Sequence, residues 1–145
     1  VALATAHASP NTLVFNVEPY GKDLSASLVA GRPLWPENPA TLETIADGMR
    51  TPALGDKPWP IIAELTQPTA LPVTDTDIRF AMRMLMERAK MVVEPSGGTS
   101  LAAALQLDQS LGKATAAPLQ RIGVIVCGGN VDIDSSPWIP PSAAP

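Results

Sequence analysis

Residues 121–134 read R-I-G-V-I-V-C-G-G-N-V-D-I-D. The run Ile122–Val126 is apolar and β-branched apart from one glycine, which is typical of a strand that is covered on both faces in a parallel sheet. The run ends at Cys127, Gly128 and Gly129, where the glycines allow positive φ angles and the close approach of another group. Ligands of open α/β sheets bind beyond the carboxyl ends of the strands, so the sulfur of Cys127 is well placed to contact one.

Length and composition describe one ordinary globular domain. The chain has 145 residues, of which 46% are hydrophobic and 17% charged, a balance that is typical of a folded protein and excludes a disordered one. The net charge of −4 and the pI near 4.8 argue against nucleic acid or an anionic membrane as the main partner. A single cysteine excludes an internal disulfide and a cysteine-based zinc cluster and fits a reducing compartment, so we expect a cytoplasmic protein. No apolar run approaches the ~20 residues that span a bilayer, and a secretory signal is not expected.

Hydrophobic periodicity and turn residues divide the rest of the chain into short elements. The proline-rich residues 32–60 also contain Leu, Ile and Met, which indicates an ordered, irregular excursion that packs on the domain. We place the domain at residues 1–134 and a proline-rich tail at residues 135–145. The expected helices are Val1–Ser9, Lys22–Val29, a helical turn near Pro60–Leu65, a helix that begins after Thr74, and Ser100–Leu111; the expected further strands are Thr12–Val17 and Ala70–Val73.

The helix after Thr74 has the clearest pattern. Thr74 is a good N-cap residue, and Asp77 follows three residues later as in a capping box. Apolar residues then recur at helical spacing, which predicts one buried stripe. The stripe consists of Ile78, Ala81, Met82, Leu85 and Ala89.

Two motifs have both a functional and a purely structural interpretation. Glu94-Pro95-Ser96-Gly97-Gly98 opens a helix with a glycine turn that could hold an anion or a cofactor ring, although an ordinary connection between helices is the more frequent meaning of such a motif. The turn Cys127-Gly128-Gly129-Asn130 could be a phosphate cradle, although no Lys or Arg follows it, or its cysteine could be a nucleophile, a cofactor contact or a buried structural cysteine. The only histidine that could serve as its base is His7, far away in the sequence.

Glu18, with Asp23 five residues later, could form half of a divalent-cation site, since such cations bind several oxygen ligands. A solvated pair of carboxylates at a strand end is the alternative.

Four motifs in this order resemble the serine racemase and serine/threonine dehydratase family, which are fold-type II enzymes that use pyridoxal phosphate (PLP). They are T-L-E-T-I-A-D-G-M (Thr41–Met49), P-W-P-I-I (Pro58–Ile62), M-V-V-E-P-S-G-G (Met91–Gly98) and V-C-G-G-N-V-D (Val126–Asp132). The resemblance runs from Val1 to about Ile133. It implies an α/β fold in which a three-layer, mostly parallel twisted sheet is flanked by helices, with the cofactor at the carboxyl ends of the strands.

The same resemblance implies a set of cofactor-binding residues. Cys127 matches the small residue that contacts the pyridine nitrogen, and Gly128 continues the final glycine turn. Gly48 matches a backbone position that lines the cofactor, and Glu94 matches a glutamate near the ring. Some members also bind Mg²⁺ or Ca²⁺ through a glutamate, a backbone carbonyl and an aspartate. Glu18 and the carbonyl of Lys22 match the first two positions, whereas Leu24 occupies the aspartate position.

The resemblance finally implies a reaction and a partner. It indicates an ammonia-lyase (dehydratase) or racemase that acts on a small hydroxy-amino acid such as serine or threonine and forms a homo-oligomer when complete. The Schiff-base lysine and the phosphate-binding loop match none of Lys22, Lys57, Lys90 and Lys113, so we expect the chain to be the C-terminal part of a catalytic unit whose N-terminal half is a separate partner. The alternative is a truncated, inactive homologue that serves as a binding or interaction domain.

Overall fold

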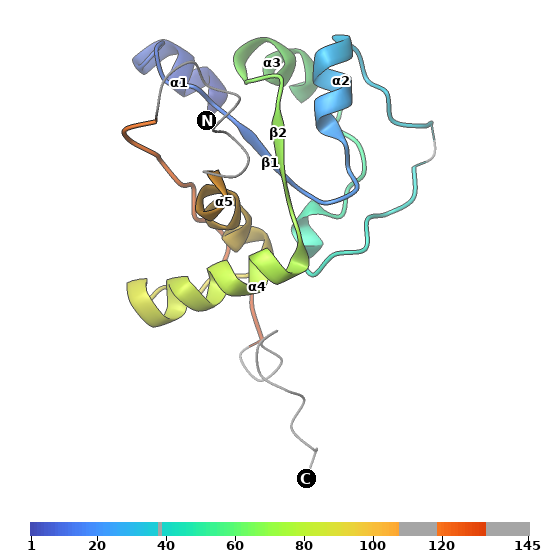
Figure 1. Cartoon of the computed structure of the whole chain (residues 1–145). Coiled ribbons are helices and arrows are strands. Elements are labelled where there is room, and N and C mark those ends of the chain that lie inside the picture. The colour runs from blue at the N-terminus through green and yellow to red at the C-terminus, as the bar shows by residue number, and fades with distance from the viewer. Residues whose placement is uncertain (38, 108–118, 133–145) are drawn as a thin grey trace.

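The computed structural model describes residues 1–37, 39–107 and 119–132, and in these residues helices flank a parallel sheet (Figure 1). The α/β class expected from the sequence is therefore confirmed. The strands are β1 (Asn16–Pro19) and β2 (Ala70–Val73); the α-helices are α1 (Ala2–Ala8), α2 (Leu24–Ala30), α3 (Pro58–Leu65), α4 (Asp75–Met84) and α5 (Pro95–Leu105); the 3₁₀-helix η1 is Asp47–Met49 and the π-helix η2 is Leu85–Ala89. No helix in these three ranges is long and apolar enough to cross a membrane.

The two strands pair in parallel, with Asn16 opposite Ala70 and Pro19 opposite Val73. Parallel strands need a long crossover, and the chain between them contains α2, η1 and α3. β2 has the predicted bounds, whereas β1 begins four residues later than the predicted strand Thr12–Val17. The shift follows from the available partners: the carbonyl of Val14 accepts a hydrogen bond from the loop residue Gln67, and strand pairing begins only beyond it.

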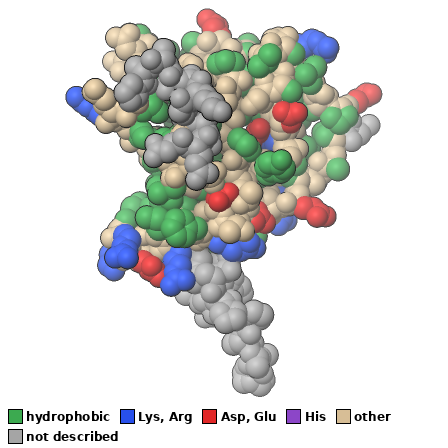
Figure 2. Space-filling view, in the orientation of Figure 1, with side chains coloured by type: hydrophobic (Ala, Val, Ile, Leu, Met, Phe, Trp, Pro, Cys, Tyr) green, Lys and Arg blue, Asp and Glu red, His purple; other side chains and the backbone are tan. Residues whose placement is uncertain are grey.

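The predicted capping box of α4 is present. The Thr74 Oγ1 accepts from the backbone N–H of Asp77 at 3.3 Å, and Asp77 Oδ2 accepts from the backbone N–H of Thr74 at 2.8 Å. The stripe is buried from Ile78 to Leu85, but Ala89 is exposed. Ala89 leaves the stripe because the helix widens into η2 and ends at Lys90, which has a positive φ of 59°. Basic side chains lie on the opposite face of α4 and η2, together with an acidic one, Glu87, which pairs with Arg83 (Figure 2).

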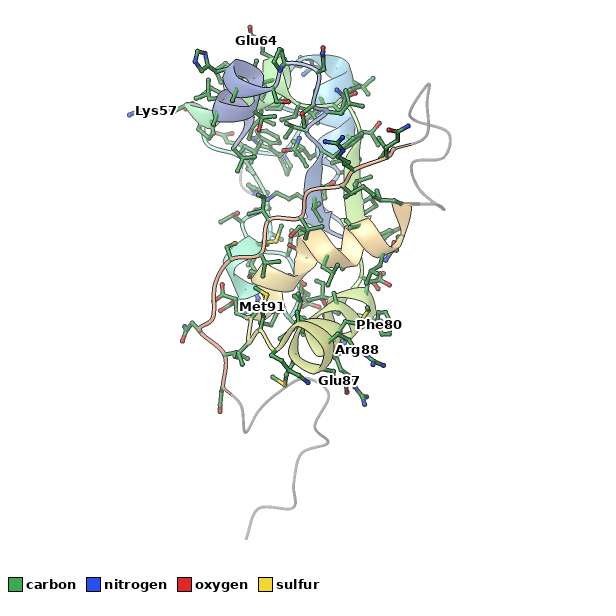
Figure 3. The ribbon with its side chains drawn as sticks, turned by 90° about the vertical axis from the view of Figure 1, so that its left-hand side faces the viewer. Lys57, Glu64, Phe80, Glu87, Arg88 and Met91 are labelled. Atoms are coloured by element: carbon green, nitrogen blue, oxygen red, sulfur yellow. The ribbon has the colours of Figure 1, made fainter. Side chains whose placement is uncertain are left out.

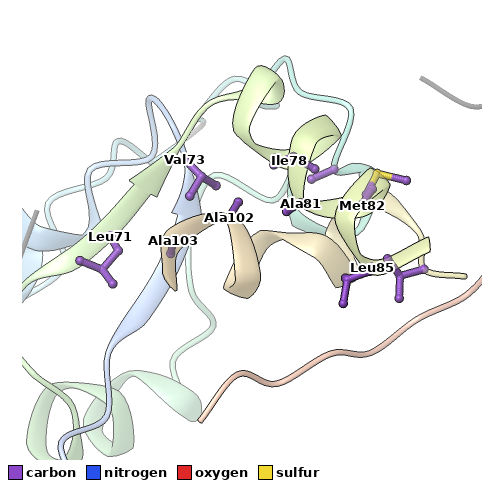
Figure 4. Close-up of a cluster of buried hydrophobic side chains, with 10 residues drawn as sticks. Leu71, Val73, Ile78, Ala81, Met82, Leu85, Ala102 and Ala103 are labelled. Carbon is purple, nitrogen blue, oxygen red and sulfur yellow. The ribbon is translucent and has the colours of Figure 1, made fainter. Parts of the chain in front are cut away.

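Helix α5 begins at Pro95, five residues earlier than the predicted helix Ser100–Leu111, whose last residues lie outside the described ranges. It packs on both strands and on α4. A Cβ on Gly98 would lie 2.9 Å from Cγ of Met82, so a glycine lets the two helices approach closely. Residues of β2, α4 and α5 form one buried hydrophobic cluster (Figure 4), which includes Leu71, Val73, Ile78, Ala81, Met82, Leu85, Ala102 and Ala103.

The prediction of a strand at Ile122–Val126, covered on both faces, is wrong. This segment is extended, but it has no strand partner among the described residues, and a strand requires a ladder of backbone hydrogen bonds. Val124 and Val126 are half-buried, whereas 52% of Ile122 and 56% of Ile125 are exposed. The apolar pattern therefore marks a segment that is suited to a sheet but unpaired here.

Residues 32–60 form the expected irregular excursion, apart from Asn38, which lies outside the described residues. The excursion contains η1 and leads into α3, which starts with Pro58 at a position where proline needs no N–H donor. Trp35 and Trp59 meet edge to face with ring centroids 5.4 Å apart, which ties the two ends of the excursion together. The predicted tail, residues 135–145, lies outside the described ranges.

Candidate functional site

Three segments that are distant in sequence meet at the N-terminus of α5. The Ser96 hydroxyl accepts a hydrogen bond from the backbone N–H of Gly48 at 3.0 Å. The backbone N–H of Glu94 donates to the carbonyl of Gly128 at 3.2 Å. The structure thus brings together all the residues predicted to contact the cofactor, including Cys127, which directly precedes Gly128.

Glu94 holds the glycine turn with both its backbone and its side chain. Its Oε2 accepts a hydrogen bond from the backbone N–H of Asn130 at 3.0 Å. Gly128 has a φ of +75°, and a Cβ there would overlap the Glu94 carboxyl group. Only glycine fits such a position without strain, so the carboxylate lies directly on the backbone of the turn.

Gly97 lets the turn contact the helix. A Cβ at this position would overlap the carbonyl oxygen of Cys127, so the turn packs against the backbone of α5. The thiol of Cys127 is free and exposed. A buried structural cysteine, one of the alternatives considered above, is therefore contradicted, and His7 lies on α1, which packs against α3.

The Gly48 side of the site is fixed by α4. Asp75, the first residue of α4, accepts hydrogen bonds from the Thr44 hydroxyl at 2.6 Å and from the backbone N–H of Ile45 at 3.2 Å. The N–H of Gly48 lies 2.8 Å from Oδ1 of Asp47 and also contacts Ser96. Local sequence patterns gave neither Asp75 nor Ser96 a long-range partner. Their long-range contacts, which connect residues 31 and 48 positions apart, had no signal in a single sequence.

The resulting surface fits a flat aromatic cofactor. Gly48 and Gly128 are exposed and carry no side chain that would block access, whereas Gly97 is buried beneath the turn; the Cys127 thiol is accessible beside them. The described residues offer no lysine in this cluster as a covalent anchor: Lys57 lies by α3, far from Met91, which is three residues before Glu94 (Figure 3). Lys90 donates from Nζ to the carbonyl of Glu87 at 2.7 Å.

The predicted cation ligands lie elsewhere, at the end of β1. Glu18 is buried, and both of its carboxylate oxygens face the backbone N–H of Leu24, at 3.0 and 3.2 Å. Burial raises the pKa of Glu18, while the Leu24 hydrogen bond and the charge of Lys22 act to lower it. Burial also lowers the pKa of Lys22. Mg²⁺ and Ca²⁺ bind six or more oxygens, and no group of three potential side-chain ligands occurs in the part of the chain that is described. These residues fit a divalent cation poorly, and the cation itself stays a prediction.

Comparison with known proteins places this geometry in context. A family model described as "Pyridoxal-phosphate dependent enzyme" matches residues 1–128. The chain is 43% identical over 134 residues to an L-threo-3-hydroxyaspartate ammonia-lyase of Pseudomonas sp, covering 92% of this chain and 39% of that protein. It is 42% identical over 134 residues to a serine racemase of Oryza sativa subsp. japonica, covering 92% and 38%.

Solved structures agree with the sequence comparison. A pyridoxal 5′-phosphate-dependent aspartate racemase superposes with a TM-score of 0.86 and 37% identity, covering 95% of this chain and 42% of that one. Maize serine racemase superposes with a TM-score of 0.78 and 39% identity, covering 92% and 39%. The chain thus spans about two fifths of the length of the relatives that it matches.

Proposed function

Because the chain belongs to the family of pyridoxal-phosphate-dependent enzymes, we propose that it forms one wall of the PLP site in an ammonia-lyase or racemase that acts on serine, threonine or a similar small hydroxy-amino acid. Ammonia-lyase and racemase activities are those named for its relatives. The observation that carries the proposal is the meeting of Gly48, Glu94, Cys127 and Gly128 at the start of α5.

When bound, PLP supplies an electron sink for negative charge at the substrate α-carbon. In this proposal Cys127 presents its thiol to the ring nitrogen. A thiol does not hold that nitrogen protonated as a carboxylate would, because it carries no compensating negative charge in its protonated form. The sink is consequently weaker, which favours elimination or racemisation over transamination.

Glu94 and Gly48 have structural roles in this proposal: Glu94 holds the turn that carries Cys127, and Gly48 lines the ring. The Glu94 carboxylate accepts from the Asn130 N–H and so holds the turn that carries Cys127. The Gly48 N–H donates to the Ser96 hydroxyl. In this proposal the exposed remainder of the Gly48 backbone lines the ring. The lysine that anchors the cofactor and moves the α-proton is proposed to come from polypeptide other than these 145 residues.

Co-expression tests the proposal. The chain is produced together with the part of the Pseudomonas ammonia-lyase that it does not match, and the purified complex is assayed for PLP absorbance, for keto acid release and for racemisation of serine and threonine. We expect activity with the natural chain, substantial retention with Cys127→Ser and a clear loss with Cys127→Ala, because serine keeps a hydrogen-bonding group at the ring nitrogen.

A change in ring electronics separates a contact at the nitrogen from general damage to the site. Cys127→Asp should retain PLP but shift its absorbance and the ratio of transamination to elimination, because a carboxylate favours the protonated ring. If the complex forms and none of the variants alters bound PLP, the role of Cys127 is wrong. If the complex binds no PLP, the chain is a non-catalytic interaction domain.

A further inference from the structure

The Glu18 carboxylate connects the end of β1 to the start of α2. Glu18 is 5% exposed, and its two oxygens accept from the backbone N–H of Leu24, the first residue of α2, at 3.0 and 3.2 Å. Figure 1 shows the chain turning back between β1 and α2. We call the contact of Glu18 with residues 22–24 the joint.

The joint uses both carboxylate oxygens as hydrogen-bond acceptors. A Ca²⁺ ion that binds both oxygens of a carboxylate lies between them, at about 2.3–2.6 Å from its ligands. In this chain the N–H of Leu24 occupies that position, since its nitrogen is almost equally far from the two oxygens. The positive end of the N–H dipole repels a cation, so a cation would have to displace this hydrogen bond to bind there.

Leu24 also places an apolar side chain where the family resemblance implies a third oxygen ligand. It is 5% exposed, and leucine has no side-chain atom that coordinates a cation. Positive charge comes instead from Lys22, which is half-buried and attracts the Glu18 carboxylate, while the exposed Asp23 repels it. The chain itself thus supplies both a hydrogen-bond donor and a positive charge to Glu18.

Hydrogen bonds also fix the rest of α2. The Ser25 hydroxyl accepts from the backbone N–H of Ala70 in β2 at 2.9 Å, and the buried Ser27 hydroxyl accepts from the backbone N–H of Leu34 at 3.1 Å. In the described parts of the chain, no buried side-chain oxygen or nitrogen lacks a hydrogen-bond partner. A site built for a cation would leave carboxylate oxygens without partners, because nothing else satisfies them.

We infer that the joint takes the place of a divalent cation: Glu18 holds the start of α2 through the Leu24 N–H, and the structure of this region is independent of Mg²⁺ and Ca²⁺. This inference goes beyond the proposed function and does not rest on it, because the joint belongs to the fold of these 145 residues. One substitution, Leu24→Asp, adds the missing oxygen ligand and should make the joint respond to a cation.

Hydrogen exchange of the Leu24 amide tests the joint in the natural chain and in the co-expressed complex. Exchange is measured with EDTA and then with an excess of Mg²⁺ or Ca²⁺. We expect the amide to be protected with EDTA and its exchange rate to change less than about twofold when the cation is added. Protection that appears only with the cation, or no protection under either condition, overturns the inference.

Leu24→Asp and Leu24→Asn form a matched pair for a second measurement. Both introduce a polar side chain of the same shape, but only aspartate adds a negative charge. We expect saturating Ca²⁺ to raise the unfolding temperature of Leu24→Asp by about 5 °C or more, because a cation that binds only the folded form stabilises it. The natural chain and Leu24→Asn should not respond. Titration calorimetry with CaCl₂ measures the binding itself.

The outcomes separate this inference from the proposed function. Binding of Ca²⁺ or Mg²⁺ to the natural chain that is lost in Glu18→Gln overturns the inference, since Glu18 is then a ligand. A folded Leu24→Asp that binds no Ca²⁺ also overturns it; if that variant does not fold, exchange of the natural Leu24 amide decides. A complex without PLP or activity, in which Leu24 stays protected with EDTA, supports the inference and contradicts the proposed function.

Discussion

At the scale of single residues, the candidate site depends on positions where a side chain has no room. Gly97 and Gly128 allow α5, the Glu94 carboxylate and the Cys127 turn to lie in direct contact. Gly123, in contrast, has nothing within 4 Å of where its Cβ would be. Gly97 and Gly123 thus differ in whether a Cβ would fit, which makes a matched comparison possible.

We predict that Gly97→Ala detaches the Cys127 turn from α5. The added Cβ displaces the backbone carbonyl of Cys127. Alanine also favours the helix by about 1 kcal/mol relative to glycine, and this gain offsets the lost contact, so the overall free energy of unfolding changes little. Losing the Glu94 to Gly128 hydrogen bond should speed exchange of the Glu94 amide roughly fivefold to tenfold. Gly123→Ala is the control and should leave that exchange rate unchanged; equal rates in the two variants would contradict the packing described above.

The sequence predicted which residues lie together better than it predicted the contacts between them, and their role at a cofactor stays a prediction. Gly48, Glu94, Cys127 and Gly128 were identified because they occur in ordered motifs, and the structure brings them together. The role of Ser96 was missed because a serine at the start of a helix has an adequate local explanation. Its long-range contact to Gly48 depends on how α4 and α5 place two loops, which no local pattern encodes.

At the scale of elements, α4 is held at its start by the capping box and along its length by the buried stripe. Partial burial acts to raise the pKa of Asp77, but hydrogen bonds from the Thr74 side chain, the Thr74 backbone and the Gln106 side chain outweigh it and lower the pKa below its ordinary value. The folded protein therefore stabilises the ionised form of Asp77 relative to the protonated form more than the unfolded chain does.

This lowered pKa predicts how stability depends on pH. The contribution of Asp77 is complete above the unfolded pKa near ~4 and is lost as pH falls through the lower folded pKa. Asp77→Ala should destabilise the protein by about 0.5–2 kcal/mol at pH 7 and flatten the loss of stability below about pH 4. Urea unfolding at several pH values measures both effects. The exposed Asp56 provides the control variant Asp56→Ala, and identical pH profiles for the two variants would refute the assignment.

The packing of α4 on α5 gives a second prediction at this scale. Met82 is 1% exposed and contacts the α5 glycine, whereas Met91 is 43% exposed. Met82→Ala should destabilise by about 2–5 kcal/mol because it leaves a cavity between the helices. Met91→Ala should stay within about 0.5 kcal/mol, as surface substitutions usually do. Chemical denaturation of both variants measures the difference, and a similar loss for both would show that the stripe is not the core.

Elements that are specified by their own residues were predicted well, and the element that needs a partner was not. The capping box and stripe of α4 lie within one helix, and β2 has the predicted bounds. Residues 122–126 have strand composition, but a strand also requires a neighbour, and the described part of the chain provides none. Composition predicted the conformation of this segment correctly and its pairing incorrectly.

At the scale of the whole molecule, the α/β class followed from the sequence because β-rich runs alternate with helical patterns and because the motifs resemble a known family. The candidate site has the residues predicted to line a cofactor but lacks a lysine in contact with them among the described residues. The complete enzyme therefore joins two portions of polypeptide at one site, in the proposal made above.

This division predicts where the cofactor is attached. Borohydride treatment of the active co-expressed complex, followed by peptide mass spectrometry, should find PLP on a lysine of the other polypeptide. Simultaneous replacement of Lys22, Lys57, Lys90 and Lys113 by arginine should leave the labelling intact, because arginine preserves the charge and these positions do not anchor the cofactor. A labelled lysine within the 145 residues would contradict the proposed division.

The extended segment at residues 122–126, unpaired among the described strands, has a practical consequence for handling the protein. Arg121 is exposed and lies well before the turn that Glu94 holds, so trypsin should nick the isolated chain there before it attacks the packed helices. The smaller product would carry away the only sulfhydryl. Thiol titration of the large product, after the small one has been removed under denaturing conditions, would then report how much of the preparation is still intact.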